Sequence, residues 1–320
     1  MNEQKVSIVI ANYNGKDLLE NLLKSIAKSN YKNYEIIVVD NNSSDGSRQF
    51  IKKNYRNVRL IENKKNLGYS GINSTLKFCK GKYILFLNND MEIDKNCIGN
   101  LIKVILSDKN TVMSAPKLVN FYDKNLKSGG TWVSRAFYNG HIKSENKDDL
   151  VEIPYLGVGL IKKDFVEMYG YLFDPDYFIY GEDLDLGLRI RLNGKKVMFV
   201  PNAIMYHMHA VTTGKTSRAF TTFLMERNLL TTFFKILSFK NILIFLPYVF
   251  VMRAIAILSD ISKLNFSNLF SRIKAILWIA FNFGIIIKKR KETQKFRKVT
   301  DKYVLEIFNE KYIFKKSFII

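Results

Sequence analysis

The first candidate for chemistry is the acidic stretch YGEDLDLGLRIR at residues 180–191, in a chain of formal net charge +21. Glu182, Asp183 and Asp185 fall within four positions, at the start of a segment whose leucines recur at helical spacing. A helix dipole favours acids in a first turn by about 0.3–1 kcal/mol, which explains one or two of them. The aromatic run PDYFIY before them instead predicts a desolvated carboxylate with a raised pKa, as a general base needs. These residues alone leave both interpretations open.

Other candidates follow apolar, strand-like runs. Asp40 ends YEIIVVD and Asp90 ends ILFLNND. A carboxylate in such a place can accept hydrogen bonds from a nucleoside, or hold a divalent cation that shares its oxygen ligands with phosphates. His207 and His209 of YHMH would lie on one side of a strand, as metal ligands or as structural histidines. Each pattern also fits ordinary turn and cap residues.

The elements that must position these residues alternate between strands and helices in the first half of the chain. Apolar, β-branched runs predict strands at residues 6–11, 34–40, 58–63 and 82–90. This rhythm predicts an α/β fold with a mainly parallel sheet and helices on both faces. In such sheets ligands bind beyond the carboxyl ends of the strands. The polar runs NYNG, DNNSSDGS and NND all fall there, so we expect the site at that edge.

The second half is less regular. We predict strands at 111–119, 196–201 and 204–210, and extended structure in VEIPYLGVGLIKK, followed by a short helix in DFVEMYG. Residues 120–150 are polar and are expected to form loops.

The C-terminal part is both apolar and basic. From Phe220 onward there are 18 Lys and Arg against 6 Asp and Glu. The run ILIFLPYVFVM ends before Arg253, and AILWIAFNFGIII at 275–287 precedes KKRK. The second run is shorter than the ~20 apolar residues of a spanning helix. Apolar helices with basic flanks favour the headgroup region of an anionic membrane. A helical cap packed on the rest of the chain and a true span are the alternatives.

The composition excludes several classes of protein. With 47% hydrophobic residues the chain can bury a core, which excludes global disorder. Cys79 and Cys97 have no spacing of a metal site or disulfide framework, and the start MNEQKVSIVIA lacks a signal peptide, so we expect a cytoplasmic location. The basic excess suggests an anionic partner such as nucleotide phosphates or lipid headgroups. Nucleic acid is not expected, because no basic-aromatic RNA motif is present.

Taken in order, VSIVIANYNG, IIVVDNNSSDGS, NLGYSGIN, FLNND, GEDLDLGLR and YHMHAVTTG resemble the family 2 glycosyltransferases. The chain is most similar to their rhamnosyltransferase-like branch, from about Val6 to Asn228. The resemblance implies a GT-A fold, a nucleotide-diphosphate-sugar donor, a divalent cation (Mg²⁺ or Mn²⁺) and inversion at the anomeric carbon. It also implies a catalytic domain at 1–228, with a nucleotide-binding half at about 1–90 and an acceptor half at 91–228. Residues 229–320, outside the resemblance, are expected from their apolar and basic sequence to form a helical, membrane-associating region.

The resemblance assigns roles residue by residue. Asp183, the second residue of the family's Glu-Asp pair, would be the catalytic base. Asp90 and His207 would hold the metal, since Asn88 stands in place of the first acid of the family's DXD motif, and the His-to-Gly pattern maps onto His207 to Gly214. The donor would meet Tyr13, Asp40, Asn66, Gly68, Asn88 and Asn89, and the acceptor would meet Gly157, Glu182 and Asp185.

The function expected from these residues is transfer of a sugar to a hydroxyl of a glycan or lipid-linked acceptor at the cytoplasmic membrane face. A transferase acting on a polyprenyl phosphate is one alternative, because that acceptor needs little proton removal. A non-catalytic sugar-nucleotide binder and a basic nucleic-acid-binding protein are alternatives of a different class.

Overall fold

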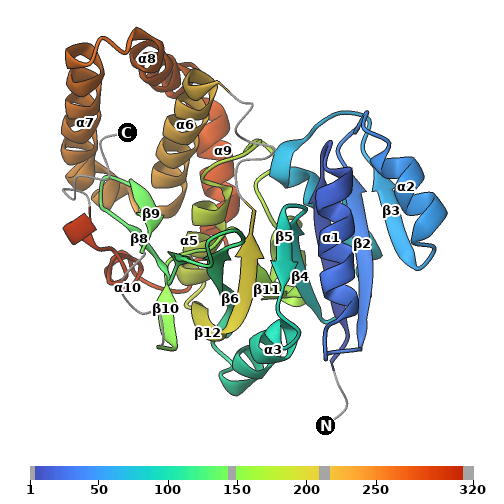
Figure 1. Ribbon diagram of the computed structural model, residues 1–320. Helices are drawn as coiled ribbons and strands as arrows, with labels where there is room; N and C mark the ends of the chain where they lie inside the picture. Colours follow the sequence, from blue (N-terminus) through green and yellow to red (C-terminus); the bar gives the residue numbers. More distant parts are fainter. Residues whose placement is uncertain (1–3, 143–148, 209–216, 313–320) are drawn as a thin grey trace.

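The computed structural model describes residues 4–142, 149–208 and 217–312 (Figure 1). A sheet with helices packed on it forms one part of the molecule, and the C-terminal helices gather at the end opposite the first strands and helices.

The N-terminal half alternates as its hydrophobic pattern predicts. Its elements are β1 (Val6–Asn12), α1 (Lys16–Ala27), β2 (Tyr34–Asp40), α2 (Ser47–Asn54), β3 (Val58–Glu62), the 3₁₀ helix η1 (Gly68–Phe78) and β4 (Tyr83–Asn88). Strands β3, β2, β1 and β4 are neighbours in this order, and every pairing among them is parallel. β1 and β4 are buried along nearly their whole length, because helices cover both faces of a parallel sheet.

The second half completes the sheet and adds the helix with the acidic stretch. Its elements are β5 (Met91–Ile93), α3 (Cys97–Ser107), β6 (Thr111–Asn120), β7 (Leu126–Ser128), β8 (Thr131–Val133), β9 (Asn139–His141), β10 (Val151–Ile153), β11 (Gly159–Lys162), α4 (Lys163–Tyr169), α5 (Glu182–Leu192) and β12 (Lys196–His207). The sheet runs β10-β12-β6-β11-β4-β1-β2-β3. β11 is antiparallel to both β4 and β6, and β12 is parallel to β6.

The described part of the C-terminal region consists of helices and the short segments that connect them. It contains α6 (Arg218–Ile236), α7 (Phe239–Ser262), α8 (Phe266–Phe281), α9 (Phe283–Gln294), α10 (Asp301–Leu305) and the 3₁₀ turn η3 (Glu310–Tyr312). The domain boundary expected at residue 228 falls inside α6. Leu229 and Phe233, just beyond it, share one hydrophobic cluster with Leu184 and Leu188 of α5. The helical region and the sheet region therefore share a core where the boundary was expected.

The predicted α/β fold with a mainly parallel sheet is confirmed, with three local differences. Residues 120–150 are not wholly loop-like, because the short strands β7, β8 and β9 lie there. The two strands expected at 196–201 and 204–210 are one strand, β12, whose pairing with β6 shifts register between Val200 and Ile204. Between β3 and β4 the chain forms the 3₁₀ helix η1 in place of the α-helix that the alternating pattern predicts.

Candidate active site

The polar residues that follow β1, β2 and β4 meet at one edge of the sheet. Asn12 is the register partner of Asp40, and Ala11 is the partner of Asn88. Because the three strands are parallel and adjacent, their carboxyl ends, with Tyr13 and Asn89 just beyond, lie side by side. The edge predicted to carry the site therefore exists.

Asp40 and Asn89 are held in a buried chain of hydrogen bonds at this edge. Asn12 Nδ2 donates to Asp40 Oδ2 at 2.9 Å, and Asn89 Nδ2 donates to Asn12 Oδ1 at 2.8 Å. Ser43 N donates to the other oxygen of Asp40 at 2.8 Å, and both Asp40 and Asn89 are buried. These two side chains thus shape the edge, whereas Tyr13 is 37% exposed beside them. Asn12 was missed from sequence, where it reads as one more polar residue after a strand.

Asn66 and Gly68 form a tight turn beside this edge. Asn66 Oδ1 accepts a hydrogen bond from Gly68 N at 2.8 Å, and Asn41 Nδ2 donates to Gly68 O at 2.8 Å. Gly68 has φ +63°, and a Cβ there would lie 1.9 Å from the carbonyl oxygen of Phe178. Only glycine fits this close approach. The turn therefore packs directly on the segment that leads into α5.

Asp90 and His207 lie together although 117 residues separate them in sequence. His207 Nε2 is 3.2 Å from Asp90 Oδ2, and both side chains are largely buried. The pairing of β12 with β5, which joins His207 to Met91, brings the two residues together. Residues 209–216, with the rest of the motif that starts at His207, lie outside the described residues.

The Asp90–His207 pair fits a divalent cation that completes its shell with ligand oxygens. An oxygen and an imidazole nitrogen each about 2.1 Å from one ion can lie this close together, and Mg²⁺ is commonly held by one or two carboxylates plus phosphates. Among the described residues no group of three or more His, Cys, Asp or Glu side chains forms a closed metal site. A phosphate-sharing cation therefore fits this pair better than a structural metal.

The first turn of α5 presents Glu182 and Asp183 to the same region. Tyr180 and Gly181 before it have positive φ values of +68° and +80°, which turn the chain sharply into the helix. Asp183 Oδ1 accepts a hydrogen bond from Leu184 N at 2.8 Å, and a Cβ on Gly157 would lie 3.5 Å from Asp183 Oδ2. The backbone at Gly157 therefore lies beside the Asp183 carboxylate.

Burial changes the acidity of this pair. Burial raises the pKa of Asp183 to about 6, although the hydrogen bond from Leu184 N partly opposes the shift. Burial and the charge of Asp183 raise the pKa of Glu182 well above its ordinary value, and Glu182 Oε2 is buried with no hydrogen-bond partner among the described residues. Tyr69, whose hydroxyl donates to Gly157 O at 2.7 Å, has its pKa raised by burial and then by the charges of Glu182, Asp183 and Asp90. All three acids thus lie near enough to Tyr69 to affect its acidity.

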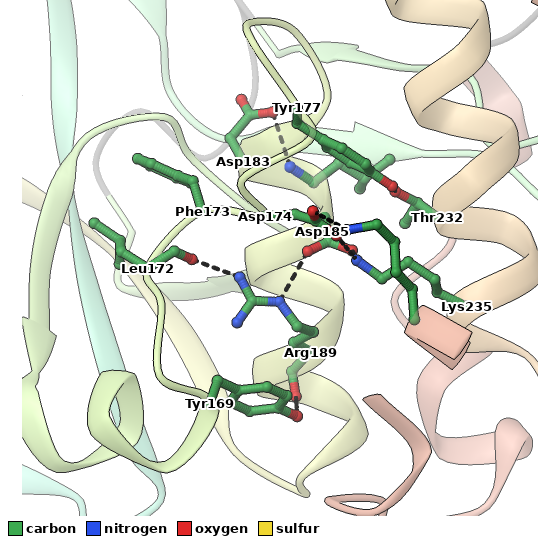
Figure 2. Close-up of polar contacts among 12 residues, drawn as sticks. Tyr169, Leu172, Phe173, Asp174, Tyr177, Asp183, Asp185, Arg189, Thr232 and Lys235 are labelled. Atoms are coloured by element: carbon green, nitrogen blue, oxygen red, sulfur yellow. Dashed lines mark hydrogen bonds and ion pairs between the residues drawn. The ribbon is translucent and has the colours of Figure 1, made fainter. Parts of the chain in front are cut away.

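Asp185 lies on the opposite side of α5 (Figure 2). Its carboxylate is fully buried and pairs with Arg189 Nε at 2.8 Å and Lys235 Nζ at 2.7 Å. Lys235 also pairs with Asp174 Oδ2 at 2.6 Å, and Arg189 donates to the carbonyl of Leu172 at 2.5 Å. The expectation that Asp185 orients an acceptor is therefore wrong, because no acceptor can reach it.

Helix α6 holds the segment that precedes α5. Asn228 Nδ2 donates to the carbonyls of Tyr180 at 2.6 Å and Ile179 at 3.2 Å, and Arg227 donates to the carbonyl of Asp176 at 3.0 Å. Asn228 is fully buried. Lys235, seven residues further along α6, is fully buried as well. Sequence patterns missed the role of Lys235, because a lone lysine in an apolar helix carries no signal of its partners.

Comparison with known proteins identifies relatives. A 93-residue stretch is 42% identical to the poly(ribitol-phosphate) beta-glucosyltransferase of Bacillus spizizenii, covering 27% of this chain and 15% of that protein. A 107-residue stretch is 38% identical to a UDP-Glc:alpha-D-GlcNAc-diphosphoundecaprenol beta-1,3-glucosyltransferase of Escherichia coli, covering 32% of this chain and 42% of that protein. The matches thus span less than half the length of these relatives.

Solved structures share the fold. GalNAc-T7 with UDP, GalNAc and Mn²⁺ matches 88% of this chain and 57% of that chain, with a TM-score of 0.64 at 18% identity. A mannosyltransferase of Pyrobaculum calidifontis in complex with GDP-Man and Mn²⁺ matches 95% of this chain and 86% of that chain, with a TM-score of 0.54 at 15% identity. The GT-A fold is therefore confirmed. The family model described as glycosyl transferase family 2 matches residues 7–166, half of the sequence. The chain belongs to glycosyl transferase family 2.

Proposed function

We propose that the chain is an inverting glycosyltransferase that moves a sugar from a nucleotide-diphosphate sugar to a hydroxyl of a lipid-linked or glycan acceptor. The observation that carries the proposal is the contrast at the sheet edge between two sets of acids. In the described part of the chain Asp183 and Glu182 are desolvated and have no paired cation, whereas Asp90 lies against His207. The proposed base and the proposed cation site thus both lie near Tyr69. A displacement at an anomeric carbon requires such a pair.

The donor is proposed to lie along the carboxyl ends of β1, β2 and β4. Tyr13 offers an exposed ring for the nucleoside. Asn88 and Asn89 directly precede Asp90 and are proposed to contact the donor between the nucleoside and the cation. Asp40 supports this edge from beneath and meets the nucleoside only through its remaining lone pairs, since both oxygens already accept hydrogen bonds. The turn of Asn66 and Gly68 closes the donor site on the side of α5.

Asp90 and His207 would hold Mg²⁺ or Mn²⁺ together with the donor diphosphate. When bound, the cation stabilises the negative charge that develops on the departing diphosphate. The rest of the reaction depends on the residues of α5 and on Gly157.

Asp183 acts as the general base in this proposal. Its Oδ2, next to Gly157, accepts the proton of the acceptor hydroxyl as that oxygen bonds to the anomeric carbon. The bond between the anomeric carbon and the diphosphate oxygen breaks, and the diphosphate leaves with the electron pair from the opposite face, which inverts the configuration. A pKa of about 6 leaves Asp183 mostly ionised at neutral pH while it still binds a proton well. Glu182 and the backbone of Gly157 are proposed to orient the acceptor.

Two of the relatives support a choice of substrates to test first. One is named for UDP-Glc and an acceptor on diphosphoundecaprenol, and another for poly(ribitol-phosphate). A uridine diphosphate sugar and a lipid-linked sugar hydroxyl are therefore the first donor and acceptor that we propose. Such an acceptor would place the enzyme at the cytoplasmic face of a membrane.

The proposal is tested with Asp183→Asn in a transfer assay that uses the donor found by thermal stabilisation with a panel of nucleotide sugars. Loss of the base should lower kcat by about 10²–10⁴-fold, because general base catalysis contributes that much, while donor binding stays nearly intact. Asp90→Ala should instead weaken donor binding in the presence of Mn²⁺.

Asp17→Asn is the matched control, since Asp17 is also an acid in the first turn of a helix but is exposed on α1. Near-normal turnover of Asp183→Asn with a hydroxyl acceptor would overturn the assignment of the base. Retained transfer to a polyprenyl phosphate alone would point to the alternative acceptor.

A further inference from the structure

The hairpin formed by α7 and α8 has apolar side chains outside and charged side chains inside. On α7, Leu243, Phe250 and Ile261 are exposed, and on α8, Phe270, Leu277 and Phe281 are exposed; Phe281 is 85% accessible. Their spacing of four, seven or eleven positions places each set on one stripe of its helix. These stripes are an exposed apolar surface, which a soluble protein seldom keeps without a partner.

The inward side of the hairpin carries paired charges. Arg253 and Asp260 of α7 are 2% and 4% exposed. Arg253 Nε lies 3.3 Å from Glu226 Oε2 of α6, and Arg272 of α8 pairs with Glu226 and, at 2.7 Å, with Asp260. Two cations thus meet two acids between the three helices. Ion-paired charges inside and apolar side chains outside are the arrangement expected of a helical hairpin in a hydrocarbon environment.

The lengths of the helices agree with an apolar environment. α7 is the one helix in the described part of the chain long and apolar enough to cross a membrane, and only 17% of its most apolar window is buried. α8 and α9 qualify only as a pair, and they are bent by 71° at their junction. In Figure 1, α7 and α8 lie at the end of the molecule opposite β2 and β3, so the hairpin projects without blocking the sheet.

The charges on the hairpin surface have one sign. Between residues 239 and 281 the exposed charged side chains are Lys240, Lys263 and Lys274, and Asp260, the single acid of this span, is buried. Lysines beside an apolar stripe are attracted to anionic headgroups by about 1 kcal/mol each. A symmetric contact with a second copy would instead bring these like charges toward one another.

We propose that the α7–α8 hairpin docks on an anionic phospholipid bilayer, with its outward stripes in the acyl region and its lysines at the headgroups. The inference goes beyond the proposed transfer reaction and does not depend on it, because it rests only on the inverted polarity and the charge of the hairpin.

The test is co-flotation of the full chain with vesicles of 70% phosphatidylcholine and 30% phosphatidylglycerol, and with vesicles of pure phosphatidylcholine. The wild-type chain should float with both and bind the anionic vesicles at least tenfold more strongly. The double variant Phe270→Glu/Leu277→Glu should bind the anionic vesicles at least tenfold more weakly, because two inserted side chains are lost. Both positions are exposed, so this variant should stay folded and keep its thermal transition.

The double variant Leu106→Glu/Tyr122→Glu is the matched control, since both residues are exposed apolar side chains outside the hairpin. It should float like the wild type. Wild-type chain that stays unbound, or a hairpin variant that floats normally, would overturn the proposal. A wild-type dimer in sedimentation that Phe270→Glu/Leu277→Glu converts to a monomer, without vesicle binding, would identify a second copy as the partner instead. Stabilisation by nucleotide sugars in the same samples reports on the proposed function separately.

Discussion

The two faces of the first turn of α5 carry carboxylates in opposite environments. Asp183 and Glu182 face the sheet edge, where burial raises the pKa of each and no cation is paired with either in the described structure. Asp185, two residues beyond Asp183, faces α6 and contacts both Arg189 and Lys235. In Figure 2, Asp183 points away from the cluster formed by Asp174, Asp185 and Lys235.

This difference shows that the partner, more than the residue type, determines what an acid can do. An ion-paired, fully buried carboxylate contributes to structure, since its oxygens are occupied by the cations that it contacts. A desolvated carboxylate without a cation holds a proton more tightly and destabilises the fold at neutral pH, a feature typical of functional sites. Predictions that change one face and leave the other intact can test this division.

The largest effect on folding should come from Lys235→Met. This change removes the ammonium group that pairs with both Asp174 and Asp185, so each of these buried carboxylates loses one cation. Breaking a buried ion pair in this way typically destabilises a protein by about 3–5 kcal/mol. Urea denaturation followed by circular dichroism measures the change in the free energy of unfolding.

Lys24→Met is the control for this variant, because Lys24 and Glu20 also lie 2.6 Å apart but on the exposed surface of α1. Its urea midpoint should not move measurably, since exposed ion pairs contribute little. Equal midpoints for the Lys235 and Lys24 variants would show that the buried face of α5 does not hold the helix in place.

A smaller effect of opposite sign is expected for Asp183→Asn. The pKa of Asp183 is raised from 3.8 to about 6 in the folded chain, so the folded state binds this proton more tightly than the unfolded state. Its contribution to stability is present below pH 4 and is lost as the pH rises through about 6. The asparagine side chain has no proton to lose, so the variant does not lose stability as the pH rises. It should therefore be more stable than the wild type at pH 7.5, by about 1–3 kcal/mol in the free energy of unfolding.

Urea denaturation at pH 4.5 and pH 7.5 checks the sign, because the advantage of Asp183→Asn should shrink at the lower pH. Asp174 has the opposite linkage. Burial alone would raise its pKa, but Lys235 and Lys289 outweigh burial and hold the pKa below the ordinary value, so its contribution is lost as the pH falls below about 4. An advantage of Asp183→Asn that grew toward pH 4.5 would contradict the assigned environment.

The site edge was predictable because parallel strands place their carboxyl ends together. Apolar runs followed by polar residues identified β1, β2 and β4. Because β1 pairs with both β2 and β4, the polar residues at their carboxyl ends come together. The contact between Asp90 and His207 came from the family resemblance, because nothing in either local pattern predicts that β12 pairs with β5.

The division between Asp183 and Asp185 was not predictable from local sequence. Both lie in one helical turn, and the cation that separates their roles is Lys235, fifty residues later on α6. The sequence did not predict that Arg253 and Asp260 are buried, for the same reason. Their partners Glu226 and Arg272 lie on neighbouring helices. Tertiary partners of isolated charges leave no periodic signal.

Of the three α5-directed variants, Lys235→Met, Asp183→Asn and Asn228→Ala, the smallest effect is expected for Asn228→Ala. Asn228 acts on the catalytic face from the side of α6, because its amide holds the carbonyls of Ile179 and Tyr180 just before the turn that delivers Asp183. Without it the turn should shift slightly and lower kcat about tenfold, less than the hundredfold that a 1 Å displacement can cause. The dissociation constant for the donor should stay the same, since the donor side of the site is untouched. Thr231→Val, a buried change on the same helix that removes the hydrogen bond from the hydroxyl to the carbonyl of Arg227, should leave kcat unchanged. Parallel loss of donor binding and turnover in Asn228→Ala would indicate general unfolding; a selective loss of turnover would show that the C-terminal helices help to place the base.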